Sequence, residues 1–152
     1  MKLDYDVLTN ALSFIDAAKE RCLDLRNLKI ARIENLAMTR DLNDTIDLTN
    51  NELVVLADFP LLPRLHTLLL SHNRITQIAP TVAPALPNLT NLILSNNQIA
   101  ELDDLAGLFA FKNLVRAAFV GCPVSAKKNY RLYVISRCKN IRVLDFRRVK
   151  DL

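Results

Sequence analysis

A fixed spacing of leucine and asparagine recurs along this 152-residue chain and limits the folds open to it. Two stretches carry the pattern in the same phase: Leu65, Leu68, Leu70, Asn73 and Ile75, and then Leu89, Leu92, Leu94, Asn97 and Ile99. A unit of about two dozen residues cannot bury its own apolar face, so neighbouring units must stack and share one core. The spacing therefore predicts a stacked array with a continuous leucine core.

Weaker copies of the unit flank these two. Asn51 and Cys122 occupy the positions equivalent to Asn73 and Asn97, and successive equivalent positions are 22, 24 and 25 residues apart. These distances are typical of the leucine-rich repeat, whose period is about 20 to 29 residues. Two outer units, at residues 23–30 and 141–146, complete the array. We therefore predict an α/β protein, a right-handed leucine-rich repeat solenoid with about six parallel strands on its concave face.

The recurring asparagine is expected at the turn that leaves each strand. Its amide can pair with backbone groups of the adjacent turn that would otherwise be buried without a partner. Asparagine also tolerates left-handed backbone angles better than most residues, so we expect it to replace glycine at this turn. The chain has only two glycines, Gly107 and Gly121. Because phosphate-binding loops need clustered glycines, nucleotide-binding enzymes are nearly excluded.

Both ends of the array are predicted to be caps, since terminal repeats are atypical. Residues 4–21 place apolar side chains at helical spacing after Asp4 or Asp6, either of which could cap the helix. The stripe comprises Leu8, Ala11, Leu12, Ile15 and Ala18. A second helix is expected over residues 126–137, after Ser125 and before the final strand.

No stretch rich in Pro, Gly or Ser interrupts the pattern, so we expect one domain over residues 1–152. Its predicted parts are an N-terminal helical cap (1–21), the repeats (22–124) and a C-terminal cap (125–152). The acidic start lacks the basic and apolar regions of a signal peptide, and no run of about 18 apolar residues occurs, so a soluble chain is expected.

The sequence offers little for catalysis. Cys22, Cys122 and Cys138 are odd in number and lack C-x-x-C spacing, which suits buried, reduced thiols of a cytosolic or nuclear protein. The two histidines, His66 and His72, have no acid at a neighbouring variable position of their strand. We therefore expect neither a catalytic triad nor a zinc site. We expect no enzymatic activity and no bound metal, cofactor or small-molecule substrate.

Residues between the consensus leucines are expected to point into the concave face, because side chains alternate along a strand. These positions are Asp24, Arg26, Asp47, Thr49, Leu69, Ser71, Ile93, Ser95, Ala118 and Val120, followed by Asp145 and Arg147. The middle of this set is apolar and its ends are charged, as in a protein-binding patch. A concave sheet of this kind can hold one amphipathic helix of a partner.

Positive charge is concentrated at the C-terminal end. Residues 122–152 contain nine basic and two acidic side chains, a net charge of +7, whereas residues 1–121 carry a net charge of −3. Such an end can bind phosphates by releasing their counterions. No aromatic side chains are interleaved for base stacking, so contact with a nucleic-acid backbone is the better prediction.

Four stretches are more specific than the repeat itself. They read IDLTNNEL at 46–53, FPLLPRL at 59–65, YRLYVI at 130–135 and RVLDF at 142–146. The chain thereby resembles the A-prime family of the U2 small nuclear ribonucleoprotein over nearly its whole length. It departs at Cys122, where relatives often have asparagine, and at Asn43, where an apolar residue is expected.

The resemblance implies a non-catalytic, nuclear spliceosomal scaffold. Its concave face would hold a helix of an RNA-recognition-motif partner of the U2 B-double-prime type, and the pair would bind a U2 RNA stem-loop during pre-mRNA splicing. By position, the residues near RNA phosphates would be Lys127, Lys128, Arg147, Arg148 and Lys150.

One alternative remains open from the sequence. Leucine-rich repeat subunits of protein phosphatases or of microtubule-associated complexes share short repeats and a similar cap. The basic end distinguishes the two hypotheses, because RNA requires positive charge and a phosphatase partner does not.

Overall fold

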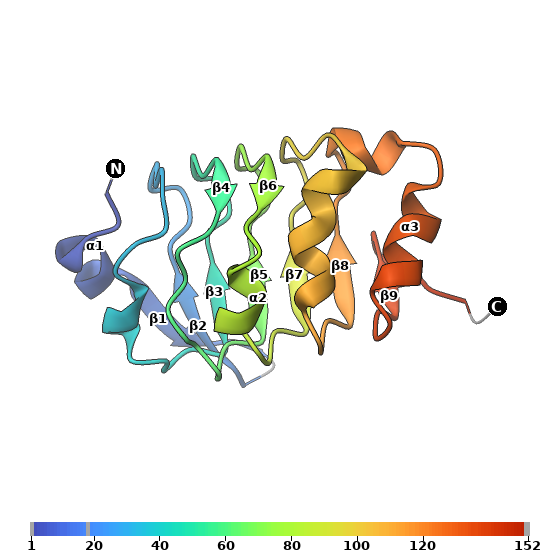
Figure 1. Ribbon diagram of the computed structural model, residues 1–152. Coiled ribbons are helices and arrows are strands. Elements are labelled where there is room, and N and C mark those ends of the chain that lie inside the picture. The colour runs from blue at the N-terminus through green and yellow to red at the C-terminus, as the bar shows by residue number, and fades with distance from the viewer. Residues whose placement is uncertain (1, 18, 151–152) are drawn as a thin grey trace.

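A solenoid with one long curved sheet is seen in the computed structural model, which describes residues 2–17 and 19–150 (Figure 1). Within these residues the sheet has eight strands in the order β1-β2-β3-β5-β7-β8-β9-β10. They are β1 (Leu12–Ile15), β2 (Arg21–Asp24), β3 (Thr45–Asp47), β5 (Thr67–Leu69), β7 (Asn91–Ile93), β8 (Arg116–Ala118), β9 (Val143–Leu144) and β10 (Arg147–Arg148). The six strands from β2 to β9 are parallel, as predicted, and the two outermost are antiparallel.

Strand register places the consensus residues in one inward-facing row. The members of this row lie opposite one another on successive strands and are all buried: Leu23, Ile46, Leu68, Leu92, Ala117 and Leu144. Because alternate side chains point to opposite faces, the residues on either side of each row member face the concave surface.

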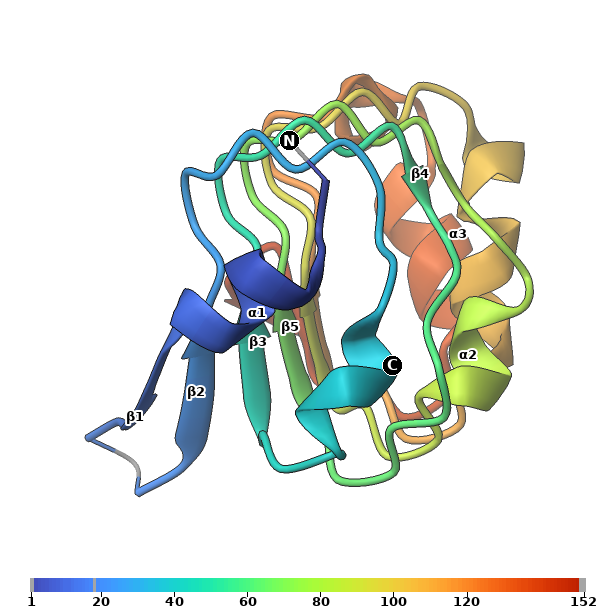
Figure 2. The ribbon, with the colours of Figure 1, turned by 90° about the vertical axis from the view of Figure 1, so that its left-hand side faces the viewer.

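Short helices and extended segments cover the other side of the core (Figure 2). They are η1 (Leu36–Thr39), α2 (Val82–Ala85), η2 (Leu102–Ala110), η3 (Pro123–Ala126) and a second small sheet of β4 (Val55–Leu56) and β6 (Gln77–Ile78). Gly107 lets η2 approach β6 closely, because a Cβ at this position would lie 2.3 Å from the backbone oxygen of Ile78. No described helix is long and apolar enough to span a membrane.

The recurring asparagines form a buried ladder that links successive turns. Asn97 is typical: its Nδ2 donates to the carbonyls of Leu70 (3.0 Å) and Leu94 (2.9 Å), and its Oδ1 accepts from the amide of Ile75 (3.0 Å). Asn51 and Asn73 make equivalent bonds. This confirms the predicted pairing of buried backbone groups.

Cys122 takes the same ladder position in the following unit. Its thiol donates to the carbonyl of Leu94 (3.1 Å) and accepts from the amide of Asn97 (3.4 Å). The thiol therefore preserves one ladder contact, the bond to the carbonyl one unit earlier, and accepts from the amide of Asn97 where the ladder pattern would use that of Ile99.

Left-handed backbone lies one residue earlier than we predicted. Positive φ angles occur immediately before the ladder positions, at Asn50, His72, Asn96 and Gly121, and not at the ladder asparagines themselves. The ladder residue has a negative φ angle and directs its side-chain amide inward. The residue before it adopts the left-handed conformation that turns the chain. Gly121 adopts this angle (φ 83°) with no Cβ, and a Cβ there would lie 2.2 Å from Oδ1 of Asn96, whose side chain would have to move.

The predicted N-terminal helix over residues 4–21 is wrong in its extent. Helix α1 spans only Tyr5–Asn10, with the Asp4 carboxylate accepting from the amide of Val7 (3.0 Å). The chain then forms β1, which pairs antiparallel with β2 and covers the edge of the parallel sheet. Ile15, expected in the helical stripe, is 58% exposed. Ala18, also expected there, lies outside the described residues.

The C-terminal cap contains a shorter helix than predicted. Asn129 has a positive φ angle of 64° and separates η3 from α3 (Tyr130–Arg137), so residues 126–129 are not part of the long helix. Helix α3 buries Tyr130 and Val134 against the core. The Tyr130 hydroxyl donates to Asp145 (2.9 Å), whose other oxygen accepts from the amide of Phe119 (2.6 Å). The division of the domain at residues 21/22 and 124/125 stays a prediction.

Candidate functional site

The predicted column of variable residues lies on the concave face. Register pairs Asp24, Asp47, Leu69, Ile93 and Ala118 in one continuous row across five parallel strands. Leu69 and Ile93 occupy its middle and are partly exposed. The concave face therefore has an apolar centre, as the sequence predicted.

A second row follows where the strands end. Backbone bonds between successive turns align its members: Arg26, Thr49, Ser71, Ser95 and Val120. For example, the amide of Asn96 donates to the carbonyl of Val120 (2.8 Å), and that of His72 donates to the carbonyl of Ser95 (3.0 Å). Val120 is 45% exposed and extends the apolar centre toward the C-terminal cap.

Two residues of the predicted column are not available for contact. Ala118 is fully buried, and Ser95 is 8% exposed. Ala118 has a single methyl group between the longer side chains of Ile93 and Asp145, and the Asp145 carboxylate reaches past it to the amide of Phe119. The apolar centre thus consists of Leu69, Ile93 and Val120, which we call the concave patch.

The N-terminal end of the column is an ion-paired cluster. Arg26 donates to both oxygens of Asp24 (2.9 and 3.0 Å) and lies 3.8 Å from Asp47. The hydrogen bonds from Arg26 hold the pKa of the Asp24 carboxyl below its usual range. Two carboxylates and one guanidinium give this end a net charge of about −1. Such a charge attracts a basic group.

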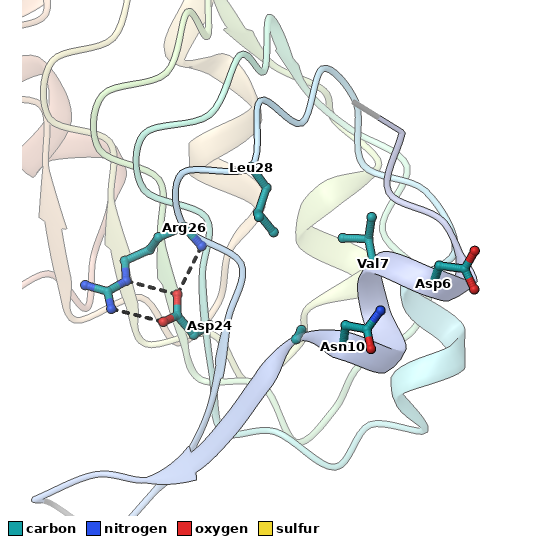
Figure 3. A pocket seen from close by; sticks show the side chains of 7 residues that line it. Asp6, Val7, Asn10, Asp24, Arg26 and Leu28 are labelled. Carbon is teal, nitrogen blue, oxygen red and sulfur yellow. Dashed lines mark hydrogen bonds and ion pairs between the residues drawn. The ribbon is translucent and has the colours of Figure 1, made fainter.

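A hollow of about 440 Å³ adjoins this cluster (Figure 3). It lies between α1 and the turn that follows β2, with Val7, Ala11 and Leu28 as its apolar lining. The Asp24–Arg26 pair forms one wall. The hollow extends the concave surface to the N-terminal cap.

One further concave row was missed from the sequence. Register aligns Thr45, Thr67, Asn91, Arg116 and Val143 at the start of the strands, and Phe14 lies opposite Cys22 in the added strand β1. Stepping two residues back along each predicted strand would have identified the first five. Phe14 could not be found this way, because the sequence analysis placed it in a helix.

His66 has an acidic neighbour that the strand pattern did not reveal. Its Nε2 lies 3.4 Å from the Glu20 carboxylate in the β1–β2 turn, and its Nδ1 lies 3.1 Å from the Thr67 hydroxyl. His72 lies beside Asn96 in the next unit (3.4 Å). Among the described residues, no three His, Cys, Asp or Glu side chains form a group that could hold a metal ion.

The three cysteines are buried, as predicted, and unpaired with one another. Burial raises the pKa of the Cys22 and Cys138 thiols to about 11, and it also raises the pKa of the Cys122 thiol. Because the thiolate is the reactive form, these residues are inert near neutral pH.

Two basic side chains of the C-terminal end make contacts within the chain. Lys127 pairs with Glu101 (3.1 Å), and Arg131 donates to the carbonyls of Leu144 (3.0 Å) and Arg148 (3.1 Å). All five predicted phosphate contacts are exposed: Lys127, Lys128, Arg147, Arg148 and Lys150. Arg147 and Arg148 form the edge strand β10, beside α3 through the Arg131 bonds.

Comparison with known proteins matches the whole chain. A family model described as "Leucine-rich repeat" matches residues 1–152. The U2 small nuclear ribonucleoprotein A′ of Homo sapiens is 47% identical over 150 residues, covering 99% of this chain and 59% of the relative. That of Aspergillus fumigatus is 46% identical over 151 residues, with the same coverage of 99% and 59%. The chain thus spans about three-fifths of the length of these relatives.

Solved structures agree with the sequence relatives. A chain of the crystal structure of the Drosophila melanogaster SNF/U2A′ complex superposes with a TM-score of 0.97 at 44% identity, covering 99% of this chain and 87% of that one. The leucine-rich repeat domain of Mex67 from Chaetomium thermophilum, at 17% identity and a TM-score of 0.53 over 86% of this chain and 83% of that one, shares the fold alone.

The stacked strands, the asparagine ladder and the concave patch define a leucine-rich repeat protein with an exposed apolar patch on its sheet. Within that class, the chain belongs to the family of the U2 small nuclear ribonucleoprotein A′ proteins.

Proposed function

We propose that this chain is a non-catalytic nuclear scaffold of the U2 small nuclear ribonucleoprotein and acts in pre-mRNA splicing. Its concave face binds a helix of an RNA-recognition-motif partner, and the pair binds a stem-loop of U2 RNA. One observation carries the proposal: the match at 44% identity and a TM-score of 0.97 to a chain of an SNF/U2A′ complex. The concave patch supports it independently.

The dimensions of the concave patch suit one helix. Leu69, Ile93 and Val120 come from three successive strands of the sheet, β5, β7 and β8 with its following turn. Strands lie about 4.8 Å apart, so three of them span about 10 Å, which matches about two turns of a helix that lies across the strands. The ion-paired cluster at Asp24 and the basic C-terminal end lie at opposite ends of the sheet, which gives a bound helix a preferred direction.

RNA recovery tests the proposed assembly directly. The full chain, tagged and expressed in nuclei of a cell with a functional spliceosome, is expected to enrich U2 RNA over the other spliceosomal RNAs. The Ile93→Arg variant is the matched control, since it should lose the partner and with it the RNA. Equal recovery of all these RNAs, or of none, would overturn the proposal. Recovery of a phosphatase catalytic subunit or tubulin in their place would favour the alternative.

Removing exposed positive charge near α3 should weaken RNA binding by the assembled pair. We expect Lys128→Gln with Arg148→Gln to lower affinity for the stem-loop about tenfold at physiological salt and to reduce the salt dependence by about two counterions. Lys127 is spared because its ion pair with Glu101 would be lost as well. Titration at several salt concentrations measures both quantities, and an unchanged slope would remove Lys128 and Arg148 from the RNA contact.

A further inference from the structure

A hollow on the outer side of the last two units is lined by three cations. It has a volume of about 280 Å³ and lies between the end of η2, the loop before β8 and the end of α3. Its lining residues are Phe109, Phe111, Lys112, Leu114, Arg137, Cys138, Lys139 and Asn140, and none of them is acidic. We propose that this basic hollow is a phosphate-binding site for an RNA backbone. The proposal rests on the proposed function and adds a contact outside the residues named there.

A second asparagine ladder brings the two lysines together. On the loops that precede the strands, the side-chain amides of Asn88, Asn113 and Asn140 donate to the carbonyls of Pro63, Pro87 and Lys112, each one unit earlier. The residue before each of these asparagines is Pro87, Lys112 or Lys139. Lys112 and Lys139 therefore occupy the same position in neighbouring turns, about one strand spacing apart.

Arg137 supplies a fixed third charge. Its guanidinium carbon lies 3.9 Å from the centroid of the Tyr133 ring, and it donates to the Ser136 hydroxyl (3.2 Å) and the Tyr133 carbonyl (3.4 Å). These contacts hold the side chain in place and offset the negative end of the α3 dipole. Lys112 and Lys139 make no ion pair with a described carboxylate, so they remain free to bind an anion.

The floor of the basic hollow strengthens its attraction for an anion. Phe111, Leu114 and Cys138 are buried and exclude water from one side. Charges interact more strongly where the surroundings are less polar, and three neighbouring cations repel one another until an anion binds. A phosphodiester suits lysines, which act as point charges and do not require a fixed bidentate geometry.

Titration of the full chain with a short blunt-ended RNA duplex of arbitrary sequence tests the site. We expect Lys112→Gln with Lys139→Gln to lower affinity for the duplex about tenfold at low salt and to reduce the salt slope by about two. The charge-matched control is Lys2→Gln with Arg32→Gln, two exposed residues of the first unit. This control should retain nearly all the affinity.

Three outcomes would overturn the assignment: equal losses in both double variants, no binding of the duplex by the unmodified chain, or tighter binding of a phosphoserine peptide than of the duplex at the same ionic strength. Circular dichroism and thermal unfolding would show that the variants are folded. The probe is independent of the protein partner. Failure of the basic hollow would therefore leave the concave-patch proposal intact.

Discussion

Replacing Ile93 with arginine is expected to reduce partner binding at least about 100-fold while leaving the solenoid folded. Ile93 lies in the middle of the concave patch, between Leu69 and Ala118 in strand register. Central apolar residues dominate interface energetics, and an unpaired charge there must lose its water when the partner helix docks. A 100-fold loss corresponds to about 2.7 kcal/mol. Isothermal titration with the purified RNA-recognition-motif partner measures the effect.

Val54→Arg provides the matched control. Val54 is 47% exposed and adjoins β4, on the side of the solenoid away from the concave sheet. The same substitution there adds the same charge without touching the patch, so affinity should stay within about twofold. Unmodified affinity in Ile93→Arg and in Leu69→Glu would show that the partner binds elsewhere.

Asn97→Ala is expected to lower the free energy of unfolding by about 1 to 3 kcal/mol. The residue is 1% exposed, and its loss leaves the amide of Ile75 buried without its acceptor. Each buried group left unpaired costs about 1 to 3 kcal/mol. The carbonyls of Leu70 and Leu94 each keep one partner, from Asn73 and Cys122, which limits the total. Urea unfolding followed by circular dichroism gives the value.

Asn88→Ala separates the effect of the buried ladder formed by Asn51, Asn73 and Asn97 from the effect of losing an exposed asparagine. Asn88 is exposed and makes one side-chain bond, to the carbonyl of Pro63 (2.7 Å). Solvent can replace that bond, so a loss below about 1 kcal/mol is expected. Similar losses in the two variants would contradict the special role assigned to the buried ladder.

The repeat phase was enough to predict the central fold. Leu68 and Leu92 pack inward because their spacing matches the strand period, and the variable positions beside them follow by alternation. Exposure was harder to predict. Ala118 occupies a variable position like that of Ile93 but is covered, because exposure depends on the length of the side chains on neighbouring strands and not on the residue's own strand alone.

The caps departed further from prediction for a related reason. The apolar spacing of residues 8–18 fits a helix, yet residues 12–15 pair with β2 because the edge of the parallel sheet leaves backbone groups unbonded. The unpaired backbone groups belong to β2, so the sequence of residues 12–15 does not show that these residues pair with it. The basic hollow was missed likewise, since the sequence alone did not show that Lys112 and Lys139 share a surface with Arg137.

The reversed direction of β1 and β10 ends the array of parallel strands on both sides. A stack of like units has no intrinsic end, and a parallel edge could accept the first unit of another copy as its next member. An antiparallel final strand presents the wrong hydrogen-bond pattern for such an addition, and β10 also carries two arginines. The array of parallel strands therefore has a fixed extent, and in the proposed complex this extent limits the length of partner helix that the concave face can contact.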